Sequence, residues 1–201
     1  FKELYKEEDG VRLFSAPGRT EIGGNHTDHQ HGCVLAGGVN LDVIAVVAPN
    51  GDNKIRIKSA GYDMDVIDID DTEINPAESG RASALIRGVC NSFIESGNIF
   101  GGFDADVESE IPAGSGLSSS AAFEVLVGTI INHLFFDGKV TQPEIAQIGQ
   151  YAENVFFGKP CGLMDQTASA VGGLVTIDFA DKAHPDIRPV HFDFSTTGHA
   201  L

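Results

Sequence analysis

Several residue types are scarce in this sequence, and each scarcity excludes a class of protein. The 201 residues include no tryptophan and only three cysteines, Cys33, Cys90 and Cys161, which lack the paired spacing of a zinc site. A disulfide framework therefore does not fit, and free thiols favour a reducing compartment, which we expect to be the cytoplasm. Long apolar runs are also missing: the richest stretch, residues 33–48, is interrupted by Asp42 and is too short to span a membrane.

Basic residues are few compared with acidic ones. Lysine and arginine total 13 against 29 acidic residues, which gives a formal net charge of −16. Because such a charge repels a phosphate backbone, we expect no nucleic-acid partner. The remaining composition, 42% hydrophobic and 21% charged, is typical of a globular protein of one domain or two small ones. The chain lacks an initial methionine and ends at Leu201 where an apolar run begins, so we expect a piece of a longer protein.

Hydrophobic periodicity predicts both strands and helices along the chain. Strands are predicted at residues 11–16, 33–48, 54–60, 103–108, 174–179 and 187–194. Helices are predicted at residues 82–94, 118–136 and 141–157, the last of which begins with a capping box from Thr141 to Glu144. This order predicts an α+β fold in which helices cover one face of a mixed sheet.

Two finer predictions concern the strands. The turn-forming residues 50–53 lie between two apolar stretches, which predicts a hairpin that pairs residues 33–48 with residues 54–60. Farther along, Asp104, Asp106 and Glu108 alternate with apolar residues. We therefore expect these acids to line a solvent-exposed face of their strand.

A glycine- and serine-rich tract, residues 112–122, lies between a predicted strand and a predicted helix. Its glycines allow the backbone to approach a ligand closely, while amides at the helix start and the hydroxyls of residues 118–120 supply hydrogen-bond donors. The tract therefore predicts binding of an anion such as phosphate. Taken alone, the same residues fit a glycine-rich turn with a serine N-cap equally well.

A polar tract at residues 16–32 gathers arginine, glutamate, asparagine, aspartate and histidines beside several glycines. Since such a set is costly in a core and unusual in a simple connection, it indicates recognition of a ligand with several hydroxyl groups. A second hypothesis is a zinc hydrolase, because imidazole and carboxylate groups are zinc ligands. Its metal ligands would come from His26, Asp28, His29 and His31.

A third tract, residues 153–166, carries carboxylates on both sides of a loop. Lys159 and Pro160 interrupt the helical pattern, so Glu153 is predicted near the end of one helix and Asp165 near the start of the next. Taken singly, Glu153 fits an ordinary surface residue and Asp165 fits a helix N-cap. Phosphoryl transfer needs an anion loop, a magnesium ligand, a group at the attacking hydroxyl and a cation, and the three tracts together contain all four.

At these tracts the sequence resembles the galactokinases, a sugar-kinase branch of the GHMP kinases. Residues 18–29 are similar to the family signature Gly-Arg-x-Asn-Leu-Ile-Gly-Glu-His-Thr-Asp-Tyr, residues 112–122 resemble the GHMP phosphate loop, and residues 161–166 resemble the galactokinase active-site loop. The resemblance implies a ribosomal-protein-S5-like α+β N-terminal domain over residues 1–201, without the C-terminal domain of the family. It further implies transfer of phosphate from ATP to the anomeric hydroxyl of galactose or a close relative.

The resemblance also implies roles for individual residues. Asp165 would contact the anomeric hydroxyl as base or electrostatic anchor, with Arg19 beside it to keep the carboxylate ionised. Ser120 and Glu153 would bind Mg²⁺, which prefers oxygen donors. The ATP phosphates would lie against Gly114, Ser115, Gly116, Leu117, Ser118, Ser119 and Ser120. The sugar hydroxyls would be held by Asn25, His26, Asp28 and the backbone of Gly162.

Departures from the signature bear on the substrate. Asn25 replaces the glutamate expected against the C6 hydroxyl of the sugar, and Glu21, Gly23 and His29 replace asparagine, isoleucine and tyrosine. Because an amide tolerates a C6 carboxylate or a bulkier group, galacturonate and an amino sugar are alternatives to galactose. A catalytically silent sugar and ATP sensor is the other hypothesis, which the retained arginine, aspartate and serine run disfavour.

Overall fold

The structure, a computed structural model, describes residues 1–5, 10–112, 114–192 and 194–198. Its strands form one seven-stranded sheet in the order β4-β3-β5-β2-β6-β7, with β1 paired to β2 off this path. The strands are β1 (Arg12–Gly23), β2 (Cys33–Pro49), β3 (Lys54–Ser59), β4 (Met64–Asp68), β5 (Phe103–Ser109), β6 (Leu174–Asp178) and β7 (Asp186–Pro189). Pairing among them is antiparallel except between β3 and β5, so the sheet is mixed.

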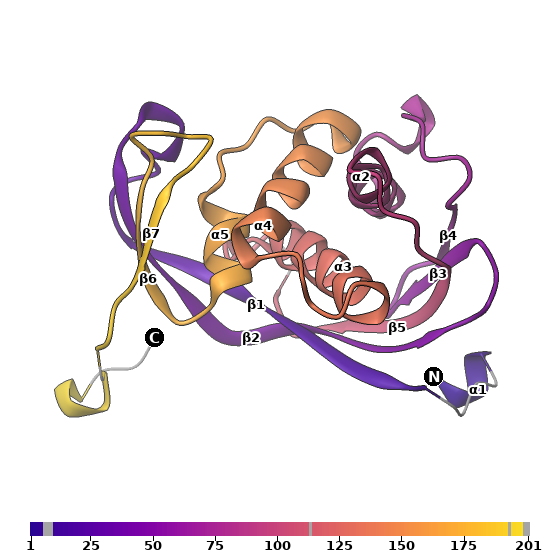
Figure 1. The fold of residues 1–201 in the computed structure, drawn as a ribbon. Helices are drawn as coiled ribbons and strands as arrows, with labels where there is room; N and C mark the ends of the chain where they lie inside the picture. The colour runs from indigo at the N-terminus through magenta and orange to yellow at the C-terminus, as the bar shows by residue number, and fades with distance from the viewer. Residues whose placement is uncertain (6–9, 113, 193, 199–201) are drawn as a thin grey trace.

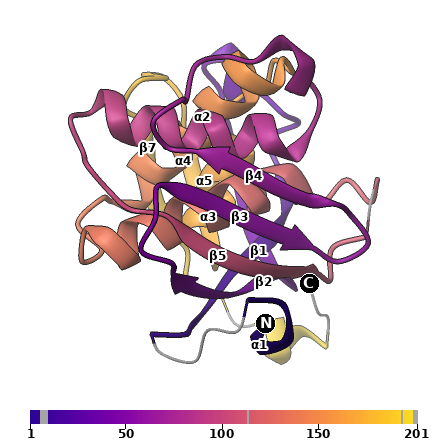
Figure 2. The same cartoon turned by 90° about the vertical axis from the view of Figure 1, so that its right-hand side faces the viewer.

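Helices cover one face of this sheet (Figure 1, Figure 2). They are α2 (Ala82–Glu95), α3 (Ser119–Phe135), α4 (Gln142–Tyr151) and α5 (Met164–Val171), and the π-helix η3 (Ala152–Phe157) continues α4. Shorter elements are α1 (Lys2–Tyr5) and the 3-10 turns η1 (Asp28–Gln30), η2 (Pro76–Glu78) and η4 (Phe194–Thr197). The predicted α+β fold, with helices on one face of a mixed sheet, is confirmed.

Element boundaries differ from the sequence prediction in four places. The strand predicted at residues 11–16 continues as β1 to Gly23, past Pro17, because β2 pairs with it there through a ladder with two register shifts. The pattern does not predict β4, whose apolar Met64 and Val66 are exposed at the sheet edge. The predicted helix 141–157 changes from α to π geometry after Tyr151. The strand predicted at residues 187–194 ends at Pro189, which suits an edge strand, and Asp193 of that stretch lies outside the described residues.

The predicted hairpin between residues 33–48 and 54–60 is wrong, because β5 lies between β2 and β3. The turn bonds to the start of β5 instead: Gly102 N donates to Asp52 O at 2.7 Å, and Asn50 N donates to Gly102 O at 3.2 Å. A Cβ at Gly102 would lie 2.2 Å from Lys54 O. A glycine there therefore allows β5 to enter between the two strands.

The predicted solvent-exposed face of β5 is also wrong at one position. Asp104 is 6% exposed, and its Oδ1 accepts hydrogen bonds from Asn50 Nδ2 at 2.7 Å and from Arg56 Nη1 at 3.1 Å. The acid is buried because the neighbouring strand β3 supplies a cation for it. Alternation along a single strand cannot reveal a partner on the next strand.

β2 is the strand around which the sheet is organised. It pairs with β1 along most of its length, with β5 through residues 43–49 and with β6 through residues 33–37. Val43, Ala45 and Val47 belong to the larger hydrophobic cluster, which includes buried residues of α2 and α3. Val34 and Ala36 belong to a smaller cluster with α5 and β6.

The capping box at the start of α4 is confirmed, and it allows a stability prediction. Glu144 N donates to Thr141 Oγ1 at 3.4 Å, and Thr141 N donates to Glu144 Oε2 at 2.8 Å. We expect Thr141→Ala to lower the free energy of unfolding by about 1 kcal/mol, measured by urea denaturation. The control Glu95→Ala, at the exposed end of α2, should change it by less than about 0.5 kcal/mol. Equal stability of Thr141→Ala and wild type would contradict the capping role.

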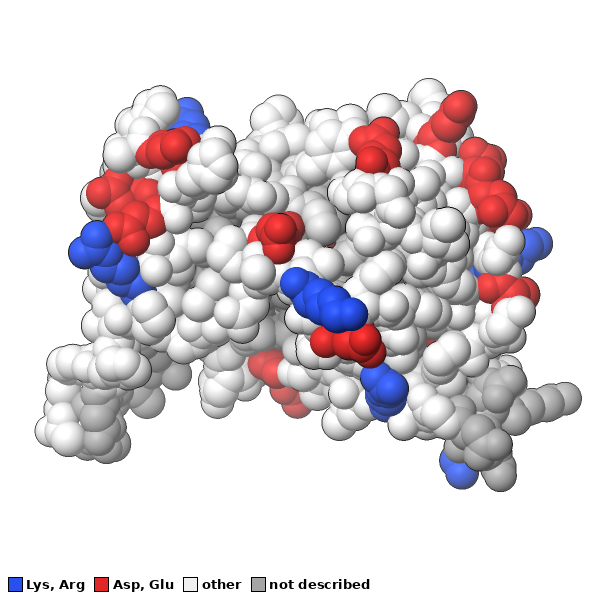
Figure 3. Space-filling view, in the orientation of Figure 1, with Lys and Arg blue, Asp and Glu red and all other residues white. Residues whose placement is uncertain are grey.

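The surface carries the acidic excess of the sequence. On the face shown in Figure 3, acidic side chains gather near both ends of the sheet, and basic side chains among the described residues form no continuous patch. Within the described part of the chain, no helix has the length and apolar character needed to cross a bilayer.

Candidate active site

Arg19 and Asp165 form a bidentate ion pair across a large sequence separation. Arg19 Nε donates to Asp165 Oδ1 at 2.7 Å, and Arg19 Nη2 donates to Asp165 Oδ2 at 2.8 Å. Arg19, on β1, is 6% exposed, whereas the side chain of Asp165, near the start of α5, is 26% exposed. The guanidinium therefore fixes the carboxylate while part of it stays accessible to a ligand.

The glycine- and serine-rich tract reaches the same ion pair from the start of α3. Arg19 Nη1 donates to the carbonyl of Gly116 at 2.6 Å, and Arg19 N donates to the carbonyl of Leu117 at 3.0 Å. Ser118 Oγ donates to Asp165 Oδ2. Ser118 has a φ of 56°, a left-handed conformation that is rare for serine and is enriched at functional sites. Residues from all three tracts thus meet at Arg19 and Asp165.

The remaining residues of this tract surround the helix start. Ser119 and Ser120 open α3, a helix of 17 residues, and Gly114 and Ser115 lie in the exposed turn before it. Ala113, in the same tract, lies outside the described residues. Because the first amides of a helix lack intrahelical partners, the tract has the donors that an anion needs.

Asp28 is held against the loop that precedes α5. It is 7% exposed, and its Oδ2 accepts a hydrogen bond from Met164 N at 3.3 Å. A Cβ at Gly162 would lie 1.7 Å from Asp28 Oδ2. The structure therefore brings Asp28 and Gly162 together, close in the chain to Asp165.

Asn25 and His26 follow β1 in a loop, with left-handed φ angles of 57° and 54°. Glu21 holds this loop: its Oε1 accepts a hydrogen bond from His26 N at 2.8 Å, and its Oε2 pairs with His26 Nδ1. Asn25 is exposed, and its side chain makes no hydrogen bond within the described residues. The signature has asparagine and glutamate at the positions of Glu21 and Asn25, so the two residue types are exchanged. In the sequence, Glu21 stands out only as a departure from the signature, and no local pattern indicates its contact with His26.

Ser120 and Glu153 lie together at the start of α3. Glu153 is 2% exposed, and its Oε1 accepts hydrogen bonds from Ser120 Oγ at 3.0 Å and from Lys159 Nζ at 2.9 Å. The bond to Glu153 raises the pKa of Lys159. A hydroxyl and a carboxylate are hard oxygen donors, and magnesium takes its other ligands from water and phosphate. These two residues therefore fit a magnesium ion.

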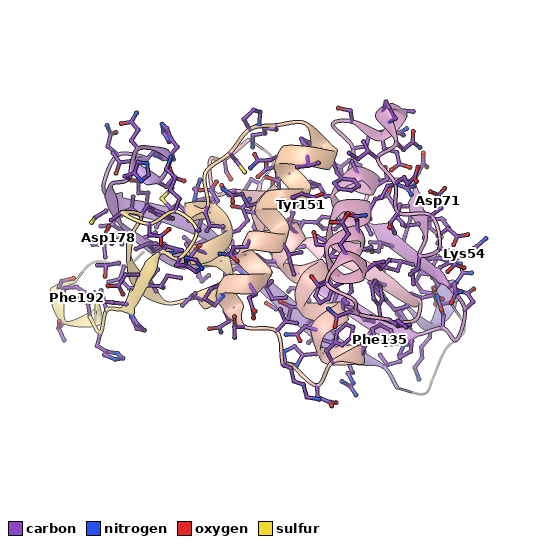
Figure 4. All side chains as sticks on the ribbon, turned by 45° about the horizontal axis from the view of Figure 1, so that its top comes forward. Lys54, Asp71, Phe135, Tyr151, Asp178 and Phe192 are labelled. Carbon is purple, nitrogen blue, oxygen red and sulfur yellow. The ribbon has the colours of Figure 1, made fainter. Side chains whose placement is uncertain are left out.

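Glu153 lies on the π-helix η3. Tyr151, labelled in Figure 4, marks the end of α4, and η3 begins at the next residue. A Cβ at Gly88 of α2 would lie 2.7 Å from Ala152 Cβ, so that glycine lets α2 and η3 pack closely. Single π turns inside longer helices are frequent at functional sites.

The zinc hypothesis finds no support in this geometry. Among the described residues, no group of three or more His, Cys, Asp or Glu side chains is arranged to hold a metal ion. His26 pairs with Glu21, and His31 Nδ1 lies 3.2 Å from the carbonyl oxygen of Ala180. His29 Nδ1 lies 3.2 Å from Asp28 Oδ1, but His26 and His31 have other partners, so the four proposed ligands do not converge on one point.

A cavity of about 600 Å³ lies beside Ser119 and Ser120. Its charged lining residues are Asp63, Asp65 and Arg81, and burial raises the pKa of Asp65. The volume is within the range of small-molecule sites. Its lining comes from several strands and helices, so no contiguous motif marks it in the sequence.

Glu124 and Gln166 are two further polar residues that the sequence analysis did not assign to the site. Gln166 Nε2 donates to Glu153 Oε2 at 2.9 Å and to Glu124 Oε2 at 3.0 Å. One signal was available: Glu124 is the single acidic residue of an otherwise mostly apolar helix, α3. An acid in that setting is unusual unless it is buried with a partner.

Two protein-family models match segments of the chain that contribute to this site. Residues 84–173 match the GHMP kinases N terminal domain, and residues 1–49 match the galactokinase galactose-binding signature. The chain is 35% identical over 202 residues to the galactokinase of Streptomyces coelicolor, a match that covers 100% of this chain and 51% of that protein.

Solved structures agree with these matches. The Lactococcus lactis galactokinase complexed with galactose superimposes with a TM-score of 0.85 at 28% identity, over 95% of this chain and 50% of that one. The mevalonate kinase of Methanococcus jannaschii, at 16% identity and a TM-score of 0.74 over 94% and 59% of the two chains, shares the fold. The chain spans about half the length of the galactokinases it matches. It therefore carries the N-terminal domain of a GHMP kinase together with the galactose-binding signature of the galactokinases.

Proposed function

We propose that the protein transfers the γ-phosphoryl group of ATP to the anomeric hydroxyl of galactose or a close relative, giving the sugar 1-phosphate and ADP. The observation that carries this proposal is the Arg19–Asp165 pair, at which residues of all three tracts meet. The similarity to a curated galactokinase and to a galactokinase complexed with galactose supports the substrate class.

Asp165 and Arg19 would carry the chemical step. The anomeric oxygen forms a bond to the γ-phosphorus while the bond from that phosphorus to the bridging oxygen of ADP breaks, and the hydroxyl proton passes late to Asp165. A sugar hydroxyl is a far weaker acid than a carboxylic acid, so Asp165 acts mainly by orientation. Arg19 holds the carboxylate through two hydrogen bonds and places positive charge near the transferred group.

The nucleotide would bind along the start of α3. Its phosphates lie against the amides and hydroxyls of residues 114–120, and its nucleoside enters the cavity beside Ser119 and Ser120. Ser120 and Glu153 would hold Mg²⁺, which would neutralise negative charge on the phosphates of ATP. Lys159, 2.9 Å from Glu153, adds a cation at this end of the site.

The sugar would bind between the loop after β1 and the loop before α5. Asp28 and the backbone of Gly162 are close enough to bind the same sugar molecule. Losing either contact should weaken sugar binding strongly, because it leaves buried polar groups unpaired. His26 and Asn25 complete the proposed set, with the exposed Asn25 amide at the C6 group. We also propose a cytoplasmic location, which the three free cysteines support.

A measurement of ADP release separates this proposal from a catalytically silent sensor. With the full protein, ATP and Mg²⁺, we expect ADP to form only when galactose or a related sugar is present. A sensor would bind the sugar without releasing ADP. Sugar binding without turnover, or ADP release that does not depend on sugar, would refute the kinase proposal.

Asn25 should determine which group at C6 is accepted. We expect wild-type protein to turn over C6-modified galactoses, including the C6 carboxylate, that Asn25→Glu rejects, because a carboxylate repels an anion and an amide does not. Turnover is compared across a panel of C6-modified sugars. Gly23→Ala is the control in the same tract, since a Cβ there meets nothing within 4 Å. Identical substrate profiles of wild type and Asn25→Glu would refute this role.

A further inference from the structure

A buried polar cluster lies behind the Ser120–Glu153 pair. It consists of Glu124 from α3, Glu153 from η3 and Gln166 from α5, which are 1%, 2% and 0% exposed. Gln166 Nε2 donates to Glu124 Oε2 at 3.0 Å and to Glu153 Oε2 at 2.9 Å. One amide group therefore joins two carboxylates that come from different helices.

The two carboxylates have different surroundings. Glu153 accepts hydrogen bonds from Ser120 and from the cation of Lys159. Burial, and after it the charge of Glu153, raises the pKa of Glu124 to about 9, so Glu124 is protonated at neutral pH.

Packing confines the cluster. A Cβ at Gly149 of α4 would lie 3.2 Å from both Gln166 Cγ and Glu124 Oε2, so these side chains have little room to turn away from Glu153. Glu124 Oε1 and Gln166 Oε1 are buried and have no hydrogen-bond partner among the described residues. A proton on Glu124 lowers the cost of burying its carboxyl group.

We propose that Glu124 and Gln166 are positioning residues, which fix the carboxylate of Glu153 so that its Oε1 faces Ser120 and the magnesium ion. This inference rests on the proposed function, because it gives the magnesium site its supporting residues. Removing such an outer partner of a metal-binding side chain typically weakens metal affinity by about 10- to 100-fold. A role in core packing alone would lower stability and leave metal affinity unchanged.

The test measures metal binding without turnover. The unfolding temperature of the full protein is followed in a non-hydrolysable ATP analogue as the Mg²⁺ concentration rises. In Glu124→Leu and Gln166→Asn, we expect the Mg²⁺ concentration for half-maximal stabilisation to rise about tenfold or more. In Glu124→Gln, which keeps the shape and hydrogen-bonding capacity of the protonated acid, we expect it to stay within about twofold.

Asn132→Leu is the matched control. Asn132 lies on the same helix, is 4% exposed and bonds to the backbone of Val140 instead. The Asn132→Leu variant should have a lower unfolding temperature but the same Mg²⁺ concentration for half-maximal stabilisation as the wild type. An equal shift in Asn132→Leu, or no shift in Gln166→Asn, would overturn the positioning role.

Two further outcomes complete the test. If Glu124→Gln raised the Mg²⁺ concentration for half-maximal stabilisation tenfold, Glu124 would supply charge to the metal. That result would also overturn the proposal. Gln166→Asn and Glu124→Gln decide the matter if Glu124→Leu does not fold. If the wild-type protein shows neither stabilisation by Mg²⁺ nor sugar-dependent turnover, the proposed function is refuted as well. If the wild type shows both, and the variants need the same Mg²⁺ concentration for half-maximal stabilisation, only the positioning role is refuted.

Discussion

Asp165→Asn should lower kcat by about 10²- to 10⁴-fold, the range typical of a group that takes part in proton transfer at the reacting atom. The amide cannot accept the hydroxyl proton, and it offers Arg19 one acceptor oxygen in place of the two that now bond at 2.7 and 2.8 Å. Affinity for the sugar should stay within about tenfold, because the interaction acts mainly in the transition state. Steady-state ADP release and a sugar titration in the absence of turnover give the two quantities.

Asp137→Asn serves as the control for that experiment. Asp137 is an exposed residue after α3 with a left-handed φ of 54°, which asparagine also tolerates, so the same chemical change is made far from the site. Its kcat should match that of the wild type. If Asp165→Asn lost sugar affinity and kcat in equal measure, Asp165 would be a binding residue, and the proposed catalytic role would be wrong.

Gly162→Ala should raise the KM for the sugar by about 10²-fold, the cost of misplacing a binding group by roughly 1 Å. The added Cβ would lie 1.7 Å from Asp28 Oδ2, so either the carboxylate or the loop before α5 must move. Because Asp28 is 7% exposed and its Oδ2 accepts a hydrogen bond from Met164 N, it has little space to move into. Sugar affinity, measured by calorimetry on the full protein, checks this expectation.

Gly23→Ala is the matched control for Gly162→Ala. It lies at the end of β1 in the sugar-binding signature, and a Cβ there meets nothing within 4 Å. It should leave sugar affinity within about twofold of wild type, since surface changes away from strained positions cost little. Equal affinities for Gly162→Ala and Gly23→Ala would exclude a close approach of Gly162 to Asp28 in the sugar complex.

The sequence predicted those parts of the molecule that depend on contiguous residues. The strand before residue 17, the capping box at Thr141 and the helix start after Ser118 follow from local patterns, and the structure confirms them. The meeting of Arg19 with Asp165 does not follow from local patterns. It was expected through the resemblance to a family, because three ordered motifs imply one shared site.

The remaining features depend on neighbours that are distant in the chain. Residues 50–53 have the composition of a hairpin turn, but Gly102 bonds to that turn and admits β5 between the strands. Asp104 looks exposed until Arg56 of the neighbouring strand is placed beside it. The cavity beside Ser119 and Ser120 and the Glu124–Gln166–Glu153 cluster arise only when several elements pack together, so no short segment encodes them.

The length of β2 has a consequence for how the molecule opens. One end of this strand contributes Val34 and Ala36 to the cluster under α5, and the other contributes Val43, Ala45 and Val47 to the cluster under α3. The Asp165 end and the serine end of the site therefore rest on one continuous strand. We therefore expect the backbone amides near Asp165 and those near Ser118 to lose their protection against hydrogen exchange together when the molecule opens.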